Sequence, residues 1–194
     1  MKRVGFILSF LLLLLGCQNI LSKKETVAYQ ELGNKIAQTV GKDLTTQLTQ
    51  KLSEGGLEHA LTFCNENAIL ITENIARNYH ADVQRISHKN RNPINRATPE
   101  DLAIINDYIE DVKKKKELEP IVDGKDNFVK YYAPILTQEK CLTCHGTVGK
   151  EVHIQTDSLI KNLYPADLAT GFQAGDLRGV WKVTFKEKIH DNIN

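Results

Sequence analysis

The chain has 194 residues, of which 41% are hydrophobic and 25% are charged. This composition is typical of a folded domain and excludes a disordered chain, and the length fits a single domain. Lysine and arginine total 25 against 24 aspartate and glutamate residues, a formal net charge of +1. Nucleic-acid binding needs a concentrated basic face, so no nucleic acid partner is expected.

The N-terminal segment has the layout of an export signal. Two basic residues precede an uncharged apolar run from Val4 to Leu15, which is too short to cross a bilayer comfortably. The sequence Leu14-Leu15-Gly16-Cys17 resembles the lipobox of bacterial lipoproteins, in which the cysteine is acylated and becomes the first residue of the mature protein. A plain signal peptide and a buried apolar helix are the alternatives.

We therefore expect residues 1–16 to be a signal peptide, Cys17 to carry a lipid anchor, and residues 17–25 to form a tether. The protein would be exported and attached to a bacterial membrane, with the periplasmic side favoured. Removal of the signal peptide would also remove Met1, which is the only methionine in the chain. The mature protein would then have no thioether ligand for a metal.

Two helices are expected next. Apolar residues recur at intervals of three or four from residue 26 to residue 52, which predicts an amphipathic helix that ends at Gly55-Gly56. A second helix is predicted over residues 57–79, and its apolar stripe places Cys64 on the buried face.

A short strand is expected over residues 82–87, followed by a loop rich in asparagine and proline over residues 88–95. Thr98 has the position of an N-cap for a third helix, with Pro99 at the first helical position and acidic residues in the first turn.

The C-terminal half reads as strands. Residues 119–122 and 127–136 alternate in polarity around Asp123-Gly124, which predicts a hairpin, and residues 179–185 form a further strand. Helices first and strands later indicate an α+β fold with an antiparallel sheet, in one domain over residues 26–190.

The segment Cys141-Leu142-Thr143-Cys144-His145 carries the attachment pattern of a c-type haem. Two thiols three positions apart can each add to a haem vinyl group, which leaves the adjacent imidazole as an iron ligand. The alternatives are a redox dithiol, a disulfide, and a zinc site that Cys64 and His153 would have to complete. An exported chain favours haem, because such haem is attached outside the cytoplasm.

The second axial position of the iron has several candidates. Removal of Met1 excludes a His/Met electron carrier. A cysteine left over in an exported protein is notable, although a free cysteine is often a small buried hydrophobe. The choice stays open between water, no ligand, a lysine, and these side chains: His59, His80, His88, His153, His190 and Cys64.

Several segments together resemble the Tll-type c-type haem domain family, which is similar in fold to PAS sensor domains. In chain order they are Ala60-Leu61-Thr62-Phe63-Cys64, Arg85-Ile86-Ser87, Arg91-Asn92-Pro93-Ile94-Asn95, Tyr132-Ala133-Pro134, the Cys141–Gly146 motif, Tyr164-Pro165-Ala166-Asp167, Gly171 and Gly175-Asp176-Leu177-Arg178-Gly179. They cover about residues 26–186.

The resemblance implies a PAS-like α+β domain with one covalently bound haem c. It also implies iron ligation by His145 and Cys64. The family often has Ala-Pro soon after this cysteine, whereas Asn65-Glu66-Asn67-Ala68 follows here. Without the proline we expect an unkinked helix.

Three further residues are candidates for the cofactor's surroundings. Arg91 and Arg178 lie in loops marked by glycine or proline and are suited to binding haem propionates, because a guanidinium pairs well with a carboxylate. Tyr132 lies in a strand-like run and is a candidate for lining the pocket. Surface arginines and a core tyrosine are the alternatives.

These features favour a membrane-anchored redox or small-ligand sensor with a low-potential haem, or an electron-transfer cytochrome. Either role would need an unidentified redox or signalling partner protein. A peroxidase-type enzyme would need an open distal site, for which His88 and Arg91 are candidates. With Cys64 on the iron no such site exists, so a non-catalytic protein is favoured.

Overall fold

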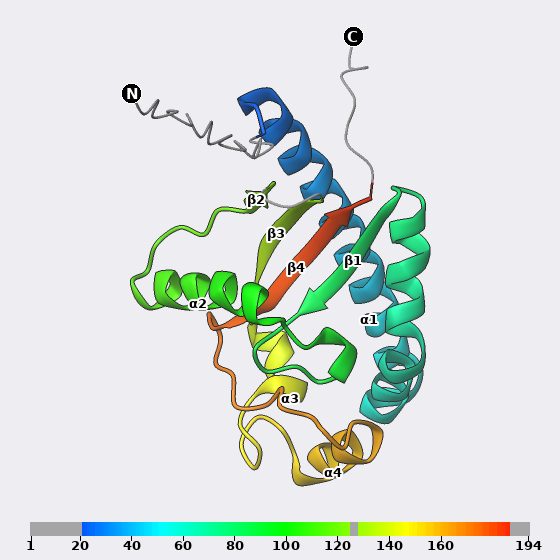
Figure 1. The fold of residues 1–194 in the computed structure, drawn as a ribbon. Coiled ribbons are helices and arrows are strands. Elements are labelled where there is room, and N and C mark those ends of the chain that lie inside the picture. The colour runs from blue at the N-terminus through cyan, green and yellow to red at the C-terminus, as the bar shows by residue number, and fades with distance from the viewer. Residues whose placement is uncertain (1–20, 125–127, 187–194) are drawn as a thin grey trace, which may run out of the picture.

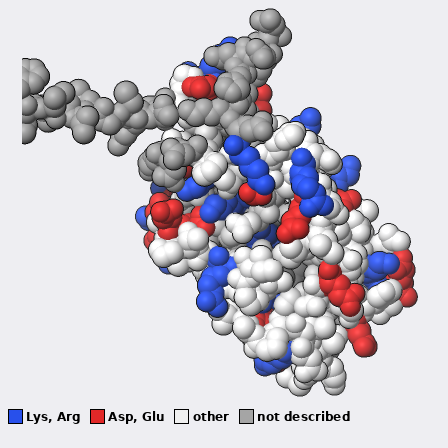
Figure 2. All heavy atoms as spheres, turned by 45° about the vertical axis from the view of Figure 1, so that its right-hand side comes forward, with Lys and Arg blue, Asp and Glu red and all other residues white. Residues whose placement is uncertain are grey.

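The computed structural model describes residues 21–124 and 128–186. The expected signal peptide, residues 17–20 of the expected tether with Cys17 among them, and His190 lie outside these residues. In the described part, no helix combines the length and the apolar character that a bilayer crossing requires. Basic and acidic side chains are interspersed over the face shown in Figure 2.

The first element is α1, Lys23–Arg77, which is two helical segments in sequence. Ser22 caps it and forms a capping box with Glu25, so the helix begins before the predicted residue 26. Gly55 and Gly56 have non-helical dihedral angles, and the φ of Gly56 is +69°. The predicted break at this pair is therefore confirmed. Glycine suits the position because it adopts this conformation without a steric penalty. The second segment continues to Arg77 without a further break, as the missing proline predicted.

Four strands form one antiparallel sheet with the order β1-β4-β3-β2. They are β1 Ala81–Ile86, β2 Ile121–Asp123, β3 Val129–Leu136 and β4 Leu177–Phe185. The predicted hairpin is the β2–β3 pair, and the last predicted strand lies at the centre of the sheet. The expected α+β class is confirmed.

Helices cover both faces of the sheet (Figure 1). The first segment of α1 packs on one face, where Gly33 approaches so closely that a Cβ there would lie 2.3 Å from the ring of Tyr131. The other face is covered by α2, Pro99–Lys113, which begins at the predicted N-cap Thr98. The sheet therefore has two separate apolar layers.

Short helices gather at one end of the sheet (Figure 1). They are η1 Pro93–Asn95, η2 Glu139–Cys141, α3 Leu142–His145 and α4 Ile154–Leu163. Sequence patterns did not predict η2, α3 or α4, because each is too short to show a helical period.

A buried ion pair fixes α2 to the sheet. Asp101 is 2% exposed and pairs with Lys182 at 2.9 Å, and it accepts a hydrogen bond from the Tyr132 hydroxyl at 2.9 Å. Burial alone would raise the pKa of Asp101, but hydrogen bonds from Lys182, Thr98 and Tyr132 lower it overall. The folded state therefore binds its proton less tightly than the unfolded chain does.

We expect Asp101→Asn to lower the free energy of unfolding at neutral pH by about 3 to 5 kcal/mol, because it leaves Lys182 buried without a counter-charge. The carboxylate's contribution is present above the ordinary carboxyl pKa and is lost as the pH falls through the lowered folded pKa. The loss should therefore shrink in acid. Urea unfolding followed by circular dichroism at several pH values measures both effects.

The matched control is Asp111→Asn, which removes an exposed ion pair with Lys116. It should change stability by less than about 1 kcal/mol. Equal losses in the two variants, or a loss that does not depend on pH, would contradict the assignment.

Candidate functional site

Cysteines from distant parts of the chain meet where α1, α3 and α4 approach one another. Cys141 ends η2 and Cys144 lies in α3, while Cys64 lies in the second segment of α1. Leu61 of α1 belongs to the same apolar cluster as Cys144. The side-chain amide of Asn65 donates to the carbonyl of Leu163 at 3.0 Å, which holds α1 against the end of α4.

The described cysteines are free thiols, and each is half-buried. The prediction that Cys64 faces the core is therefore only partly met, because one side of this residue is open. Burial raises the pKa of Cys64, and the charges of Arg85 and Arg91 oppose that rise. Burial also raises the pKa of Cys144, and the neighbouring Cys64 and Cys141 raise it further. Cys64 thus lies within electrostatic reach of the attachment motif.

The imidazole of His145 is oriented by the backbone. Its Nδ1 lies 2.7 Å from the carbonyl oxygen of Ala169. A carbonyl only accepts hydrogen bonds, so Nδ1 carries the proton and Nε2 presents a lone pair. Burial, reinforced by the charges of Arg178 and Arg91, holds the pKa of His145 well below its usual range. The ring is neutral, as a metal-binding histidine must be.

Backbone hydrogen bonds also hold the main chain next to this contact. The amide of Phe172 donates to the carbonyl of His145 at 2.9 Å, and the amide of Gly171 donates to that of Gly146 at 2.7 Å. The segment 169–172 therefore fixes both the main chain and the side chain of the motif histidine.

Arg91 joins the two segments. Its Nε binds the carboxylate of Asp167 at 3.0 Å, and its Nη2 donates to the carbonyls of Cys144 at 2.7 Å and Ala169 at 3.3 Å. The Arg91 and Asp167 side chains are only 11% and 4% exposed. Arg91 and His145 thus share Ala169 as an acceptor, and the ion pair holds the motif and its anchor together.

Phe172 is a buried aromatic residue at the centre of several cationic or titratable groups, and no sequence signal singled it out. The rings of His88 and His145 lie edge-on to it, with centroids 6.1 and 6.3 Å away. Lys89 Nζ and Arg178 Cζ lie 4.4 and 5.1 Å from its ring centroid. Its ring therefore contacts both His88 and the motif histidine.

The predicted site residue Arg178 lies beside this ring. Its Nη1 donates to the hydroxyl of Ser87 and to the carbonyl of Lys89, both at 3.1 Å. Burial, with the charges of Arg85 and Arg91, lowers the pKa of Arg178 to about 9.

Arg85 belongs to the same group and was not predicted as a site residue. Side chains alternate along a strand, so Arg85 lies on the same face of β1 as Ala81 and Val83. An arginine on an otherwise apolar strand face is the sequence signal that could have identified it. Desolvation of the guanidinium lowers the pKa of Arg85 and the neighbouring Cys64 opposes this, although the residue as a whole is exposed.

Tyr132, a predicted candidate for lining the haem pocket, is a core residue in the structure. It lies in the apolar layer under α2, where its hydroxyl donates to Asp101, whereas Arg85 faces the α1 side of the sheet. Alternation along β3 sends Tyr131 to the α1 face and Tyr132 to the opposite face. Tyr132 therefore does not join the cysteine and arginine group.

The remaining predicted histidine ligands differ in how far they are exposed. His59, His80 and His153 are exposed, and His88 is half-buried against Phe172. Within residues 21–124 and 128–186, no three histidine, cysteine or acidic side chains are grouped so as to hold a metal ion by themselves. The zinc alternative, which needed both Cys64 and His153, therefore lacks its ligand cluster.

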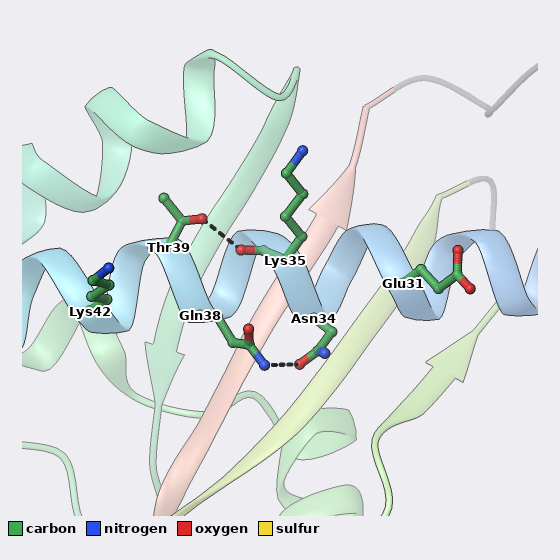
Figure 3. A pocket seen from close by; sticks show the side chains of 6 residues that line it. All are labelled: Glu31, Asn34, Lys35, Gln38, Thr39 and Lys42. Atoms are coloured by element: carbon green, nitrogen blue, oxygen red, sulfur yellow. Dashed lines mark hydrogen bonds between the residues drawn. The ribbon is translucent and has the colours of Figure 1, made fainter.

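A hollow of about 300 Å³ lies elsewhere, on the outer side of α1 (Figure 3). It is lined by Glu31, Asn34, Lys35, Gln38, Thr39 and Lys42. All six side chains come from one helix, and the hydrogen bonds drawn between them are local to that helix. The hollow contains none of the predicted site residues.

We expect Asp167→Asn to loosen the motif, because the variant leaves Arg91 without its carboxylate. Breaking a buried pair of this kind should cost about 3 kcal/mol or more of unfolding free energy. Amide hydrogen exchange should be faster at Gly171 and Phe172, whose amides bind the motif backbone. Mass-spectrometric exchange with residue resolution measures this.

Asp157→Asn is the matched control, because this aspartate pairs with the exposed Lys161 within α4. Exchange at Gly171 and Phe172 should be unchanged in the control. Identical exchange in both variants would show that the Arg91–Asp167 pair does not hold the motif.

Comparison with known proteins identifies a family that covers the site residues. The sequence model of the Tll0287-like family matches residues 18–185. No curated protein matches the chain. Among solved structures, the crystal structure of the cyanobacterial haem protein Tll0287 is similar, with 25% sequence identity over 76% of this chain and 94% of that chain and a TM-score of 0.47. Since the matched segment is most of the chain, this protein belongs to the Tll0287-like family, as the resemblance in its sequence predicted.

Proposed function

We propose that this protein binds one c-type haem through Cys141, Cys144 and His145, with Cys64 as the second axial ligand. The observation that carries the proposal is the orientation of His145. Its Nδ1 is bound to Ala169 and its Nε2 is left with a lone pair, next to two free thiols at the spacing of haem attachment. The residues present fit the group.

The thiols have separate roles in this proposal. Cys141 and Cys144 would form the thioether bonds that hold the haem, and His145 would supply the proximal nitrogen. Haem bound in this way supplies a redox-active iron whose potential is set by the ligands. The protein's own part is to keep the imidazole neutral and aimed through Ala169, Arg91 and Asp167.

Cys64 is favoured over the histidines for a geometric reason. It lies within electrostatic reach of Cys144, and the charges of Arg85 and Arg91 oppose the rise that burial causes in its pKa. His59, His80 and His153 are exposed, and His88 packs edge-on against Phe172. The family resemblance implies the same ligand pair. A thiolate is strongly donating, so it favours ferric iron and a low reduction potential.

A redox or small-ligand sensor is the role that this ligand set suits best. If the iron released the Cys64 thiol on reduction, a coordination position would become available and α1 would be held differently, which is a local change of the kind that biases a larger element. A thiol that stays bound suits an electron-transfer protein. Either role needs a partner protein.

Enzymatic turnover is not part of the proposal. Arg91, a candidate for a distal pocket, is held by Asp167 and two carbonyls, and His88 packs against Phe172. Neither contact favours a general acid over an open iron site. We also keep export and lipid anchoring through Cys17 on the periplasmic side as a proposal, based on the N-terminal sequence alone.

Covalent attachment is tested by expressing the chain with a haem-maturation system and denaturing it. The parent should retain haem on a denaturing gel, whereas Cys141→Ala/Cys144→Ala should lose it. Cys64→Ala is the control and should retain haem, because this thiol forms no thioether in the proposal. Loss of covalent haem from Cys64→Ala alone, or its absence from the parent, would contradict the assignment.

Axial ligation is tested by optical and low-temperature EPR spectra of the haem-loaded parent and Cys64→Ala. The parent should give a low-spin thiolate signature that disappears in the variant. An unchanged spectrum would make Cys64 structural. Spectra of the reduced parent, with and without carbon monoxide, separate the roles, because binding of carbon monoxide requires that the thiol has left. Rapid peroxide turnover by the resting parent would overturn the non-enzymatic proposal.

A further inference from the structure

The site holds more positive charge than its own carboxylates balance. Of its three arginines, Arg91 is neutralised by Asp167. Arg85 and Arg178 form no ion pair with any carboxylate of residues 21–124 and 128–186. Both lie at the end of the β1–β4 pair that is closest to the short helices (Figure 1).

Arg85 has fewer contacts with other described residues than Arg178 has. It makes no hydrogen bond with another described residue, and its contact is with the ring of Trp181, 6.0 Å from Cζ. Arg178 uses Nη1 for two neutral oxygen atoms, which fixes the guanidinium without cancelling its charge. Arg178 is half-buried, and a buried cation without a counter-charge costs stability unless an anion joins it. Arg85 is exposed and is therefore open to an incoming anion.

Two further polar side chains near Arg178 also lack a hydrogen-bonding partner or a counter-charge. The Nδ1 atom of His88 is buried and has no hydrogen-bonding partner in the described chain. Lys89 donates to the carbonyl of Thr170 and lies over Phe172, without an ion pair in the same residues. These groups leave donors and positive charge where an anion could bind.

We infer that Arg85 and Arg178 bind the two carboxylates of the haem, and that Arg91 does not. The inference rests on the proposed haem function and assigns a part of the cofactor to residues that the attachment motif does not include. A guanidinium matches a carboxylate in shape and hydrogen-bond donors, and each such charged bond contributes substantially to affinity. Arg91 is excluded because its Nε and Nη2 already hold Asp167 and the motif backbone.

The test compares haem with haem dimethyl ester, in which the two carboxylates are esterified and uncharged. Full-length Cys141→Ala/Cys144→Ala protein serves as the parent, so that binding is reversible for both probes. Arg85→Gln and Arg178→Gln are added singly and together. Arg96→Gln is the matched control, because Arg96 is exposed.

The parent should bind haem more tightly than the ester. Each arginine variant should weaken haem binding by at least about tenfold while ester binding stays within about twofold, as expected for a charge-assisted hydrogen bond. Arg96→Gln should leave both affinities unchanged. The Arg85→Gln apoprotein should be at least as stable to urea as its parent, because the side chain makes no internal hydrogen bond. A purely structural arginine would not give this combination.

Two results would overturn the inference while leaving haem binding intact. One is a haem-to-ester preference that the arginine variants do not change. The other is an equal loss for both probes, which would assign the arginines to the Cys64 thiolate or to the fold. Arg85→Lys and Arg178→Lys keep the charge, so they separate a lost carboxylate contact from misfolding. A parent that binds neither probe, together with a wild-type chain that carries no covalent haem, would overturn the proposed function and the inference together.

Discussion

The ion pair between Arg91 and Asp167 is the contact on which the rest of the site depends. Its members come from the loop after β1 and from the segment after α4, and through two carbonyls Arg91 also reaches Cys144 and Ala169. Because the Ala169 carbonyl also accepts the hydrogen bond from Nδ1 of His145, the same buried pair fixes the position of the motif and the tautomer of its histidine.

Much of the fold could be predicted from residue patterns. The glycine pair, the Thr98 cap and the β2–β3 hairpin follow from local stereochemistry, which needs no tertiary information. The motif could also be recognised, because two thiols and an imidazole at this spacing have a chemical meaning. Cys64 needed the family resemblance, since a lone cysteine on a helix has no spacing to interpret.

What could not be predicted depends on contacts between distant segments. The alternation in β3 was visible, but which layer received Tyr132 was decided by the placement of α2. The role of Arg91 depends on a carboxylate 76 residues away. The electrostatic environment of Arg85 includes Cys64, which lies on another element. Sequence reasoning found the residues with intrinsic chemistry and missed those whose chemistry comes from their neighbours.

The break at Gly55 and Gly56 lets one continuous stretch of chain serve two purposes. Its first segment covers the sheet, while its second carries Cys64 toward a motif near the other end of the sequence. A group held by both Cys64 and His145 would close a loop of about 80 residues, and by the loop-closure relation such a link restricts the unfolded chain strongly. Cofactor insertion would then be coupled to folding, because the two ligands come close together only in the folded chain.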